Sequence, residues 1–314
     1  MTMNILAIAI ALAGARSYPD QIVKIVVPFS PGTGMDTIAR AVSPRLMERL
    51  GQAVVVENKP GASGNIGADA VAKARPDGYT VLMGANTMLI AAQLYKNVPF
   101  DPVKDFSPVS MAAWGTLMLV ANPKTGIKSL QDLLDRAKAK PGAITYGSPG
   151  IGTPHHMAME LFSQEMGLSL LHVPYKANAG YIQDLLAGEI MVGFLPVHVA
   201  SGFVKADKLT ALAVGSSKRH PLLPNVATIE EMGKKRVEVD LWYAFFVPSK
   251  TPAAVVTRLN AEIGTVLKMP EVKEVLEKAG LDAESSTPEE LSAVVRKDHA
   301  RWGSVIKGSN ITVE

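Results

Sequence analysis

Residues 22–40 read IVKIVVPFSPGTGMDTIAR, and this stretch decides the fold class. The apolar run from Ile22 to Phe29 is typical of a buried strand. The proline and glycines of residues 31–34 predict a tight turn, and from about Asp36 onward apolar residues recur at helical spacing. A buried strand that turns through glycine into a helix begins a βαβ unit, so the stretch predicts an α/β protein.

The same alternation of strand and helix continues along the chain. Further strands are predicted over residues 53–57, 79–83, 144–147, 170–174, 190–195, 209–214 and 242–247, and helices over 61–74, 130–139, 155–165 and 179–187. Strands that alternate with helices form parallel sheets with helices on both faces. The pattern therefore predicts two mostly parallel sheets flanked by helices.

The order of these elements predicts two lobes with a ligand cleft between them. One α/β unit is built, then a second, and a late strand follows, which requires two crossings between the lobes. The candidate hinge strands are Leu117–Ala121 and Leu241–Val247. We expect residues 16–121 and 243–314 to form lobe 1 and residues 122–242 to form lobe 2.

The composition of the 314 residues excludes several classes of protein. Charges almost balance, with 32 basic and 29 acidic residues, and the longest basic run is only Lys234-Lys235-Arg236, so no surface for nucleic acid is indicated. The chain has no cysteine, which removes disulfides, thiol nucleophiles and cysteine-based metal sites.

The N-terminus has the character of a targeting segment. Residues 4–15, NILAIAIALAGA, are apolar, are too short to span a bilayer, and end in a small-x-small pattern that a signal peptidase could cut before Arg16. Residues 1–4 lack the usual Lys or Arg, and the alternative is a buried N-terminal strand or helix. We expect residues 1–15 to be a signal peptide and the mature protein to be periplasmic, where absence of cysteine is an advantage.

Two glycine-rich loops are the main candidates for a binding site. Residues 28–36, PFSPGTGMD, and residues 148–156, SPGIGTPHH, each follow a strand and open a helix, so unpaired backbone N–H groups and the helix dipole can meet an anion there. Two such loops on two lobes can close on opposite ends of one small anionic ligand. The alternative for the first loop is an ordinary turn in which Asp36 caps the helix.

Enzyme, metal and nucleotide sites are less well supported. His155-His156 lacks any metal-ligand spacing. An acyl-hydrolase triad could be assembled from Ser30 or Ser148, a histidine of that pair and Asp36, but the G-x-S-x-G elbow is absent. Glycines 61, 64 and 67 lack the opening of a dinucleotide motif. We therefore expect no catalytic residue, no metal and no cofactor.

Many sequence blocks in order resemble one family. They include residues 18–40, 50–84, 95–110, YGSPGIGTPHHMAMELF (146–162), LHVPYKA (171–177), 208–233, and the segment from Trp242 to the SKTP turn at 249–252. From Tyr18 to Ile311 the chain resembles the substrate-binding proteins of tripartite tricarboxylate transporters, the Bug family.

The resemblance implies a bilobal, type II periplasmic-binding-protein fold that closes on a carboxylated solute. It implies that main-chain amides of the two loops and ordered waters hold one ligand carboxylate, and that the protein is a monomer that delivers its ligand to membrane components of the transporter. The alternatives are a ligand-loaded sensor that docks on a membrane receptor, and a periplasmic hydrolase that uses His155 or His156. Carried over by motif, the candidate ligand-binding residues are Phe29, Ser30, Pro31, Gly32, Thr33, Gly34, Asp36, Asn86, Thr87, Ser148, Gly150, Gly152, Thr153, His155, His156 and Pro196.

Three departures from the family pattern concern this site. The usual Pro-Gly-Gly reads Pro31-Gly32-Thr33, and the motif histidine corresponds to His156, which leaves His155 at a variable position. Where relatives carry a polar stretch, this chain has Leu195-Pro196-Val197. A more apolar wall suggests, as a hypothesis, a ligand with a hydrocarbon or aromatic body between its carboxylates.

Overall fold

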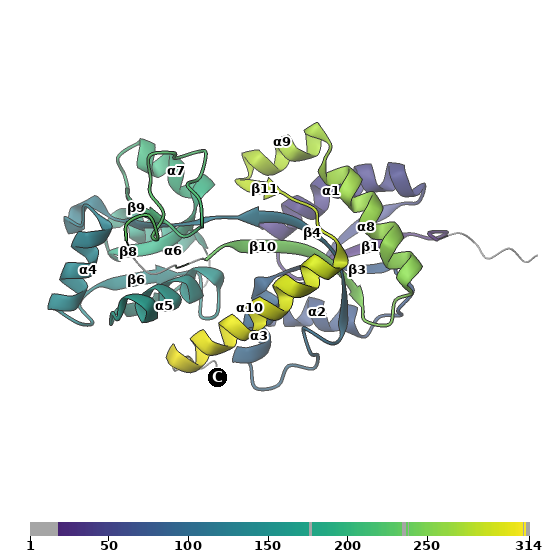
Figure 1. Ribbon diagram of the computed structural model, residues 1–314, viewed down its shortest axis with the longest axis horizontal. Coiled ribbons are helices and arrows are strands. Elements are labelled where there is room, and N and C mark those ends of the chain that lie inside the picture. The colour runs from purple at the N-terminus through teal and green to yellow at the C-terminus, as the bar shows by residue number, and fades with distance from the viewer. Residues whose placement is uncertain (1–17, 176–177, 234–236, 238, 310, 312–314) are drawn as a thin grey trace, which may run out of the picture.

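The computed structural model describes residues 18–175, 178–233, 237, 239–309 and 311. The expected signal peptide, residues 1–15, lies outside this range. The described chain forms two sheets, each covered by helices, that lie side by side along the long axis of the molecule (Figure 1). In these ranges no helix is both long and apolar enough to cross a membrane.

The larger sheet has six strands in the order β11-β4-β10-β3-β1-β2 and defines lobe 1. Its strands are β1 (Val23–Val27), β2 (Val54–Asn58), β3 (Thr80–Ala85), β4 (Phe106–Gly115), β10 (Leu241–Pro248) and β11 (Leu281–Ala283). One apolar core joins a face of the sheet to α1 (Gly34–Leu50), α8 (Ala253–Leu267) and α9 (Pro270–Lys278). A second core joins the opposite face to α2 (Asn65–Ala72), which follows the short 3₁₀ helix η1 (Ala62–Gly64), to α3 (Asn86–Leu94) and to α10 (Pro288–Ser309).

The smaller sheet has five strands in the order β7-β6-β8-β5-β9 and defines lobe 2. Its strands are β5 (Leu117–Ala121), β6 (Thr145–Ser148), β7 (Leu171–Pro174), β8 (Val192–Pro196) and β9 (Thr210–Val214). Residues from α4 (Leu130–Ala139), which follows the 3₁₀ helix η2 (Pro123–Thr125), and from α5 (Pro154–Met166) share a core with one face. Residues from α6 (Asn178–Ala187) and α7 (Val197–Lys205) share a core with the other.

The sheets are mixed, so the expectation that they are mostly parallel is wrong in this detail. The βαβ units pair in parallel, as β1–β2, β1–β3, β6–β7 and β6–β8. All pairs that involve β4, β5 or β10 are antiparallel. These are the strands at which the chain passes from one lobe to the other.

The lobes exchange chain at two places, close to the expected hinge strands. β4 continues through Thr116 into β5, and β5 pairs only with strands of the smaller sheet. Strand membership therefore moves the first crossing from residue 121, where it was expected, to Thr116. The second crossing lies between Val239, which is buried in the core of lobe 2, and β10, which pairs in lobe 1. The full division into 16–121, 122–242 and 243–314 otherwise stays a proposal.

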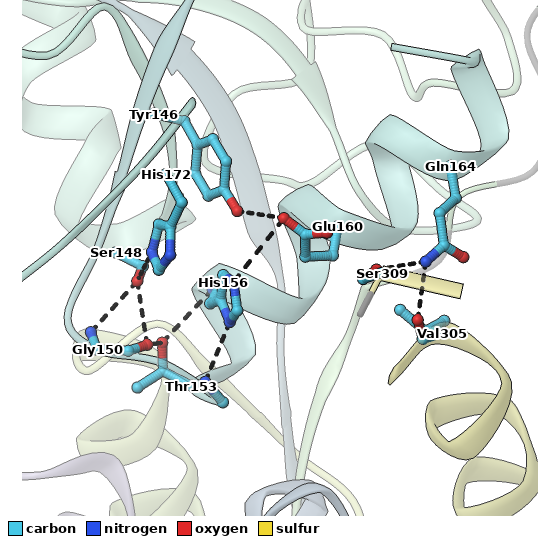
Figure 2. A network of polar contacts seen from close by, with 11 residues as sticks. Tyr146, Ser148, Gly150, Thr153, His156, Glu160, Gln164, His172, Val305 and Ser309 are labelled. Carbon is cyan, nitrogen blue, oxygen red and sulfur yellow. Dashed lines mark hydrogen bonds and ion pairs between the residues drawn. The ribbon is translucent and has the colours of Figure 1, made fainter. Parts of the chain in front are cut away.

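Helix α10 adds a third connection that the sequence did not indicate. It begins against β4 and α3 in lobe 1, and its last turns lie along α5 of lobe 2 (Figure 1). Trp302 and Val305 are buried in the core that contains α5. Gln164 of α5 donates from Nε2 to the Val305 carbonyl at 2.8 Å and also contacts Ser309 (Figure 2). α10 therefore joins the two lobes in addition to the two crossings.

Two glycines allow Tyr181 to lie on the sheet of lobe 2. Gly147 of β6 and Gly193 of β8 are register partners, and a Cβ at Gly193 would lie 2.1 Å from the Tyr181 Oη. That hydroxyl donates to the Phe194 carbonyl at 2.8 Å, so the ring cannot easily move away.

We expect Gly193→Ala to lower the free energy of unfolding by about 1–3 kcal/mol, as overpacking does in buried sites. Urea unfolding measures the change. Gly202→Ala in α7, where a Cβ meets nothing within 4 Å, is the matched control and should be neutral or stabilising. Equal stability of the two variants would contradict this account of Gly193.

Candidate functional site

In lobe 1 the expected loop lies at the point where the strand order reverses. β1 lies between β2 and β3 in the sheet. The chain leaves β1 into α1 on one face of the sheet and leaves β3 into α3 on the other face. The carboxyl ends of adjacent strands whose connections diverge in this way leave a crevice that binds ligands in open α/β sheets. Residues 28–33 and Asn86 occupy this position.

Asp36 organises the first loop from within. Its carboxylate is almost fully buried, and it accepts hydrogen bonds from the Gly32 N–H at 2.9 Å, from Asn58 Nδ2 at 2.9 Å and from Arg40 Nε at 3.0 Å. Burial alone would raise the pKa of Asp36, but the hydrogen bonds from Arg40, Gly32 and Asn58 outweigh burial and hold the pKa below its ordinary value. Asp36 and the Gly32 amide therefore bind each other and shape the loop.

The first turn of α1 keeps its backbone donors. Thr33 stands at the N-cap position, but its hydroxyl makes no capping hydrogen bond and instead donates to the Ser30 carbonyl at 3.2 Å. Within the described chain, no hydrogen bond uses the N–H groups of Gly34 and Met35. The first N–H groups of a helix carry partial positive charge and have no partner inside the helix. This end of α1 can therefore accept an anion.

Tyr243 is the residue that sequence reasoning missed. It lies on β10 and pairs with Ala85, the residue that precedes α3. A Cβ on Gly34 would lie 3.0 Å from the Tyr243 Oη, so the phenol lies over the start of α1. Burial raises the pKa of Tyr243 to about 12, which keeps the hydroxyl protonated and able to donate. The sequence predicted the strand 242–247, but only the pairing across the sheet brings its second residue to Gly34.

Asn86 opens α3 beside Tyr243. Its side chain is 1% exposed, Nδ2 donates to the Asp240 carbonyl at 3.2 Å, and Oδ1 has no partner among the described residues. Thr87, the next residue, is half-buried. The Tyr243 hydroxyl thus lies at the start of α1, and Asn86 follows Ala85, the strand partner of Tyr243.

In lobe 2 the second loop lies at the corresponding position but has different chemistry. β6 lies between β7 and β8, and α5 and α6 leave toward opposite faces. Most loop amides are already used: Gly150 N–H donates to Ser148 Oγ at 3.3 Å and Gly152 N–H donates to His156 Nδ1 at 3.1 Å. Thr153 Oγ1 accepts from the His156 N–H at 3.5 Å. The second loop therefore has fewer N–H groups free for a ligand than two matching loops would have.

The His156 side chain supports this loop through a hydrogen bond to its backbone (Figure 2). Because its Nδ1 accepts the Gly152 N–H, the ring is neutral with the proton on Nε2, which lies 3.8 Å from Glu160 Oε1. The ring stacks on His172 with centroids 4.1 Å apart, and Glu160 also accepts a hydrogen bond from the Tyr146 hydroxyl. Burial lowers the pKa of His156 to about 4. The contacts of His156 are thus to the protein itself.

His155 is different from its neighbour. It is 8% exposed, and neither Nδ1 nor Nε2 has a hydrogen-bond partner among the described residues. Its ring meets the ring of Tyr181 edge-on with centroids 6.2 Å apart. Burial lowers the pKa of His155 to about 4, so the ring is neutral near pH 7.

The arrangement does not support hydrolase chemistry. Ser148 contacts His172 Nε2 at 2.7 Å, but Ser148 is fully buried, its hydroxyl also donates to the Gly150 carbonyl, and burial lowers the pKa of His172 to about 3. No serine hydroxyl contacts either His155 or His156 in the described chain, and no group of three His, Asp or Glu side chains there is placed to hold a metal. Pro196, the remaining candidate, ends β8 opposite Leu117 and is half-buried.

The geometry and the sequence agree with one family of proteins. The family model described as "Tripartite tricarboxylate transporter family receptor" matches residues 38–311. The chain belongs to this receptor family. The resemblance noted from the sequence blocks is thereby confirmed, and so is the bilobal binding-protein fold. Proteins of this family are periplasmic binding proteins, and receptors of this kind bind solutes rather than transform them.

Individual relatives cover nearly the whole chain. A protein of Pseudomonas sp. strain P51, described as the UPF0065 protein in the tcbD-tcbE intergenic region, is 36% identical over 96% of this chain and 91% of its own length. The structure of R. palustris Rpa4515 with adipate is 32% identical to this chain and has a TM-score of 0.82. The match covers 94% of this chain and 99% of that chain. The structure of MatC from Rhodopseudomonas palustris with bound malate is 27% identical to this chain and has a TM-score of 0.79. The match covers 92% of this chain and 100% of that chain.

Two surface pockets of about 450 and 320 Å³ lie elsewhere on this receptor. The larger is at the outer end of lobe 2 beside Asn122, Lys124 and Lys208, and the smaller is beside Asn260 and Ser286 in lobe 1. Neither contains a residue of the two loops. The donors that could meet a small anion include the uncapped start of α1, the Tyr243 hydroxyl and an N–H of His155, none of which is positively charged near pH 7.

Proposed function

We propose that this receptor is exported to the periplasm, binds a small organic carboxylate between its lobes, and delivers it to a tripartite tricarboxylate-type transporter. The observation that carries the proposal is the uncapped first turn of α1 beside the protonated Tyr243 hydroxyl. Backbone donors at a helix start, together with a neutral O–H, stabilise one carboxylate without a basic side chain. Relatives that are similar over nearly their whole length were solved with adipate and malate, which supports the same class of ligand here.

The ligand is proposed to have a hydrocarbon or aromatic body between two carboxylates. Support comes from Pro196 at the end of β8, a half-buried apolar residue whose neighbours Leu195 and Val197 are buried in the core with α6 and α7, so the wall at this point has no polar side chain. A carbon chain can be buried against such a wall, whereas a hydroxyl would lose its hydration there without a partner. Adipate has such a body, and malate is shorter and carries a hydroxyl.

Binding is proposed to close the lobes. The contacts to one ligand come from both lobes only when they approach, so the ligand stabilises the closed arrangement by its differential affinity. The hinge consists of Thr116 and the segment before β10. Ligand binding does not require the transporter, so capture and delivery can be tested in separate experiments.

The test is a thermal-unfolding series with matched carboxylates. A ligand at 100 times its dissociation constant adds about 2.7 kcal/mol of stability, and we expect the melting temperature of the mature chain to rise by roughly 5 °C with the preferred dicarboxylate. Isothermal titration then gives affinities for adipate, succinate, malate and terephthalate. Tightest binding of malate would reject the apolar-body hypothesis. An absence of both shift and heat across the panel would reject the proposed function.

Delivery needs its own experiment. Uptake of the labelled ligand by cells that express the two membrane components should depend on this receptor, and the Gly34→Val variant described below should abolish that dependence. Uptake that is equal with and without the receptor would leave binding intact but refute delivery.

A further inference from the structure

The position of His155 follows from the two faces of the sheet in lobe 2. Along β5, Leu117, Leu119 and Ala121 lie in the core with α5, whereas Met118 and Val120 lie in the core with α6. The helices α5 and α6 therefore cover opposite faces. His155 belongs to the first turn of α5, yet its ring contacts the ring of Tyr181 on α6. His155 therefore connects the helices on the two faces of the sheet. Such a contact at the start of α5 is possible only beyond the carboxyl ends of β6 and β8, where the strand order reverses.

This place is close to lobe 1. A Cβ on Gly152, in the loop just before α5, would lie 2.5 Å from Leu94 Cδ1, and Ile90 of the same helix α3 is in the core shared with α5. The loop before α5 therefore meets the last turn of α3 (Asn86–Leu94), the helix whose first residue follows β3 in lobe 1.

The fold gives no reason for a histidine at this position. A buried donor or acceptor left without a partner costs about 1–3 kcal/mol. His155 has two such atoms, whereas the surrounding polar groups, namely His156, Ser148 and the amides of Gly150 and Gly152, bind one another. An apolar side chain would serve packing against Tyr181 at lower cost. Buried polar groups that the fold leaves unpaired are expected at functional sites.

We propose that His155 is the specificity-determining contact of lobe 2, donating an imidazole N–H to the second carboxylate of a dicarboxylate whose first carboxylate lies at the start of α1. This assignment rests on the proposed function and deepens it, because it makes the two lobes chemically unequal. Lobe 1 supplies backbone donors and a phenol, and lobe 2 supplies one neutral imidazole. A monocarboxylate with the same carbon chain would leave His155 unpaired.

The experiment compares matched acids on wild type, His155→Leu and His155→Gln. The probe pairs are adipate with hexanoate, succinate with butyrate, and terephthalate with benzoate, measured by isothermal titration near pH 7.5. Wild type should prefer the diacid of its best pair by at least about 10-fold. His155→Leu should weaken diacid binding by about 10- to 100-fold, the effect of one hydrogen bond to a charged group, and should bring diacid and monoacid within about threefold of each other. His155→Gln, which keeps a donor and an acceptor, should restore part of the preference.

A second readout separates this assignment from a structural role. Without ligand, His155→Leu should unfold at the same or a higher temperature than wild type, because it removes two unpaired buried nitrogens. If His155→Leu binds the diacid with an unchanged preference over the monoacid, the assignment is overturned and the proposed function stands. If the leucine variant does not fold, the same result in His155→Gln overturns the assignment. A lower unfolding temperature of ligand-free His155→Leu with an unchanged preference would show that the residue is structural. Wild type that binds no acid of the three pairs would overturn both.

Discussion

Lowering the pH from 7.5 to 5 is expected to reduce the free energy of unfolding by about 4 kcal/mol through His155 and His156 alone. Both have a folded-state pKa of about 4 against an ordinary value of 6.5, with burial as the cause. The unfolded chain therefore binds more protons than the folded chain between these values. The stability is fully present above pH 6.5 and is lost as the pH falls toward 4, by about 2 kcal/mol for each ring at pH 5.

The arrangement around His156 gives this loss a structural meaning. A proton on Nδ1 of His156 must displace the Gly152 N–H that donates to it, so protonation breaks the loop between β6 and α5. His172, stacked on His156, has its pKa lowered to about 3 by burial and by the neighbouring His156, and it acts in the same direction. The loss of stability should therefore be accompanied by loss of ligand binding.

Urea unfolding at several pH values measures the effect. His155→Leu is the informative variant, because it should remove about half of the 4 kcal/mol while leaving the His156 network intact. His299 on α10 is half-buried and lies outside the His155–His156 pair, so it provides the matched control, and His299→Gln should keep the wild-type profile. A stability that is flat between pH 7.5 and 5 would show that these rings are not neutral and buried in solution.

Gly34→Val is expected to weaken binding of the preferred carboxylate by about 100-fold or more. A Cβ at this position lies 3.0 Å from the Tyr243 Oη and 3.2 Å from its Cζ, so the larger side chain must displace the phenol from the start of α1. The ligand would lose the Tyr243 hydroxyl and access to the first-turn amides, and each hydrogen bond to a charged group contributes about 1.5–3 kcal/mol. Two such bonds correspond to about 100-fold in affinity or more.

The fold should tolerate this change. Gly34 is the half-buried first residue of α1, and its φ is not positive, so a side chain is compatible with the backbone. Gly202→Val in α7 is the matched control, since a Cβ there meets nothing within 4 Å and lies outside the loops. Titration calorimetry on both variants decides the matter, and unchanged affinity in Gly34→Val would exclude the start of α1 as the carboxylate site.

Local pattern predicted the βαβ units well and the sheet order poorly. The run from Val23 to Val27, the turn after it and the apolar face of α1 are properties of neighbouring residues, so periodicity is sufficient to find them. The direction of β10 relative to β3 depends on the pairing of Tyr243 with Ala85, which are far apart in the chain. For the same reason the crossing was expected at Ala121 and lies at Thr116, because only the partners of β5 reveal its sheet.

In the site, the sequence could not predict which backbone N–H groups are used by side chains of the protein itself. Both glycine loops have the composition of an anion-binding turn, yet His156 Nδ1 and Ser148 Oγ use the amides of the second loop, whereas Thr33 leaves those of α1 free. Asp36 was expected as a ligand contact or a cap, and its carboxylate instead binds Gly32, Asn58 and Arg40. These outcomes depend on side-chain directions that spacing in the sequence does not determine.

The packing of α10 changes the mechanics of the proposed closure. Leu291 and Val295 anchor the helix in lobe 1, and Trp302 and Val305 anchor it in lobe 2. A hinge at Thr116 alone would offer little resistance to rotation of the lobes. A helix packed into both lobes resists this rotation, because the rotation must deform the helix or its packing. Separation of the lobes must bend α10 or remove Trp302 from the core of lobe 2, and both changes cost free energy. The C-terminal helix thus stabilises the arrangement of the lobes described here, and the energy needed to change it is determined far from Thr116.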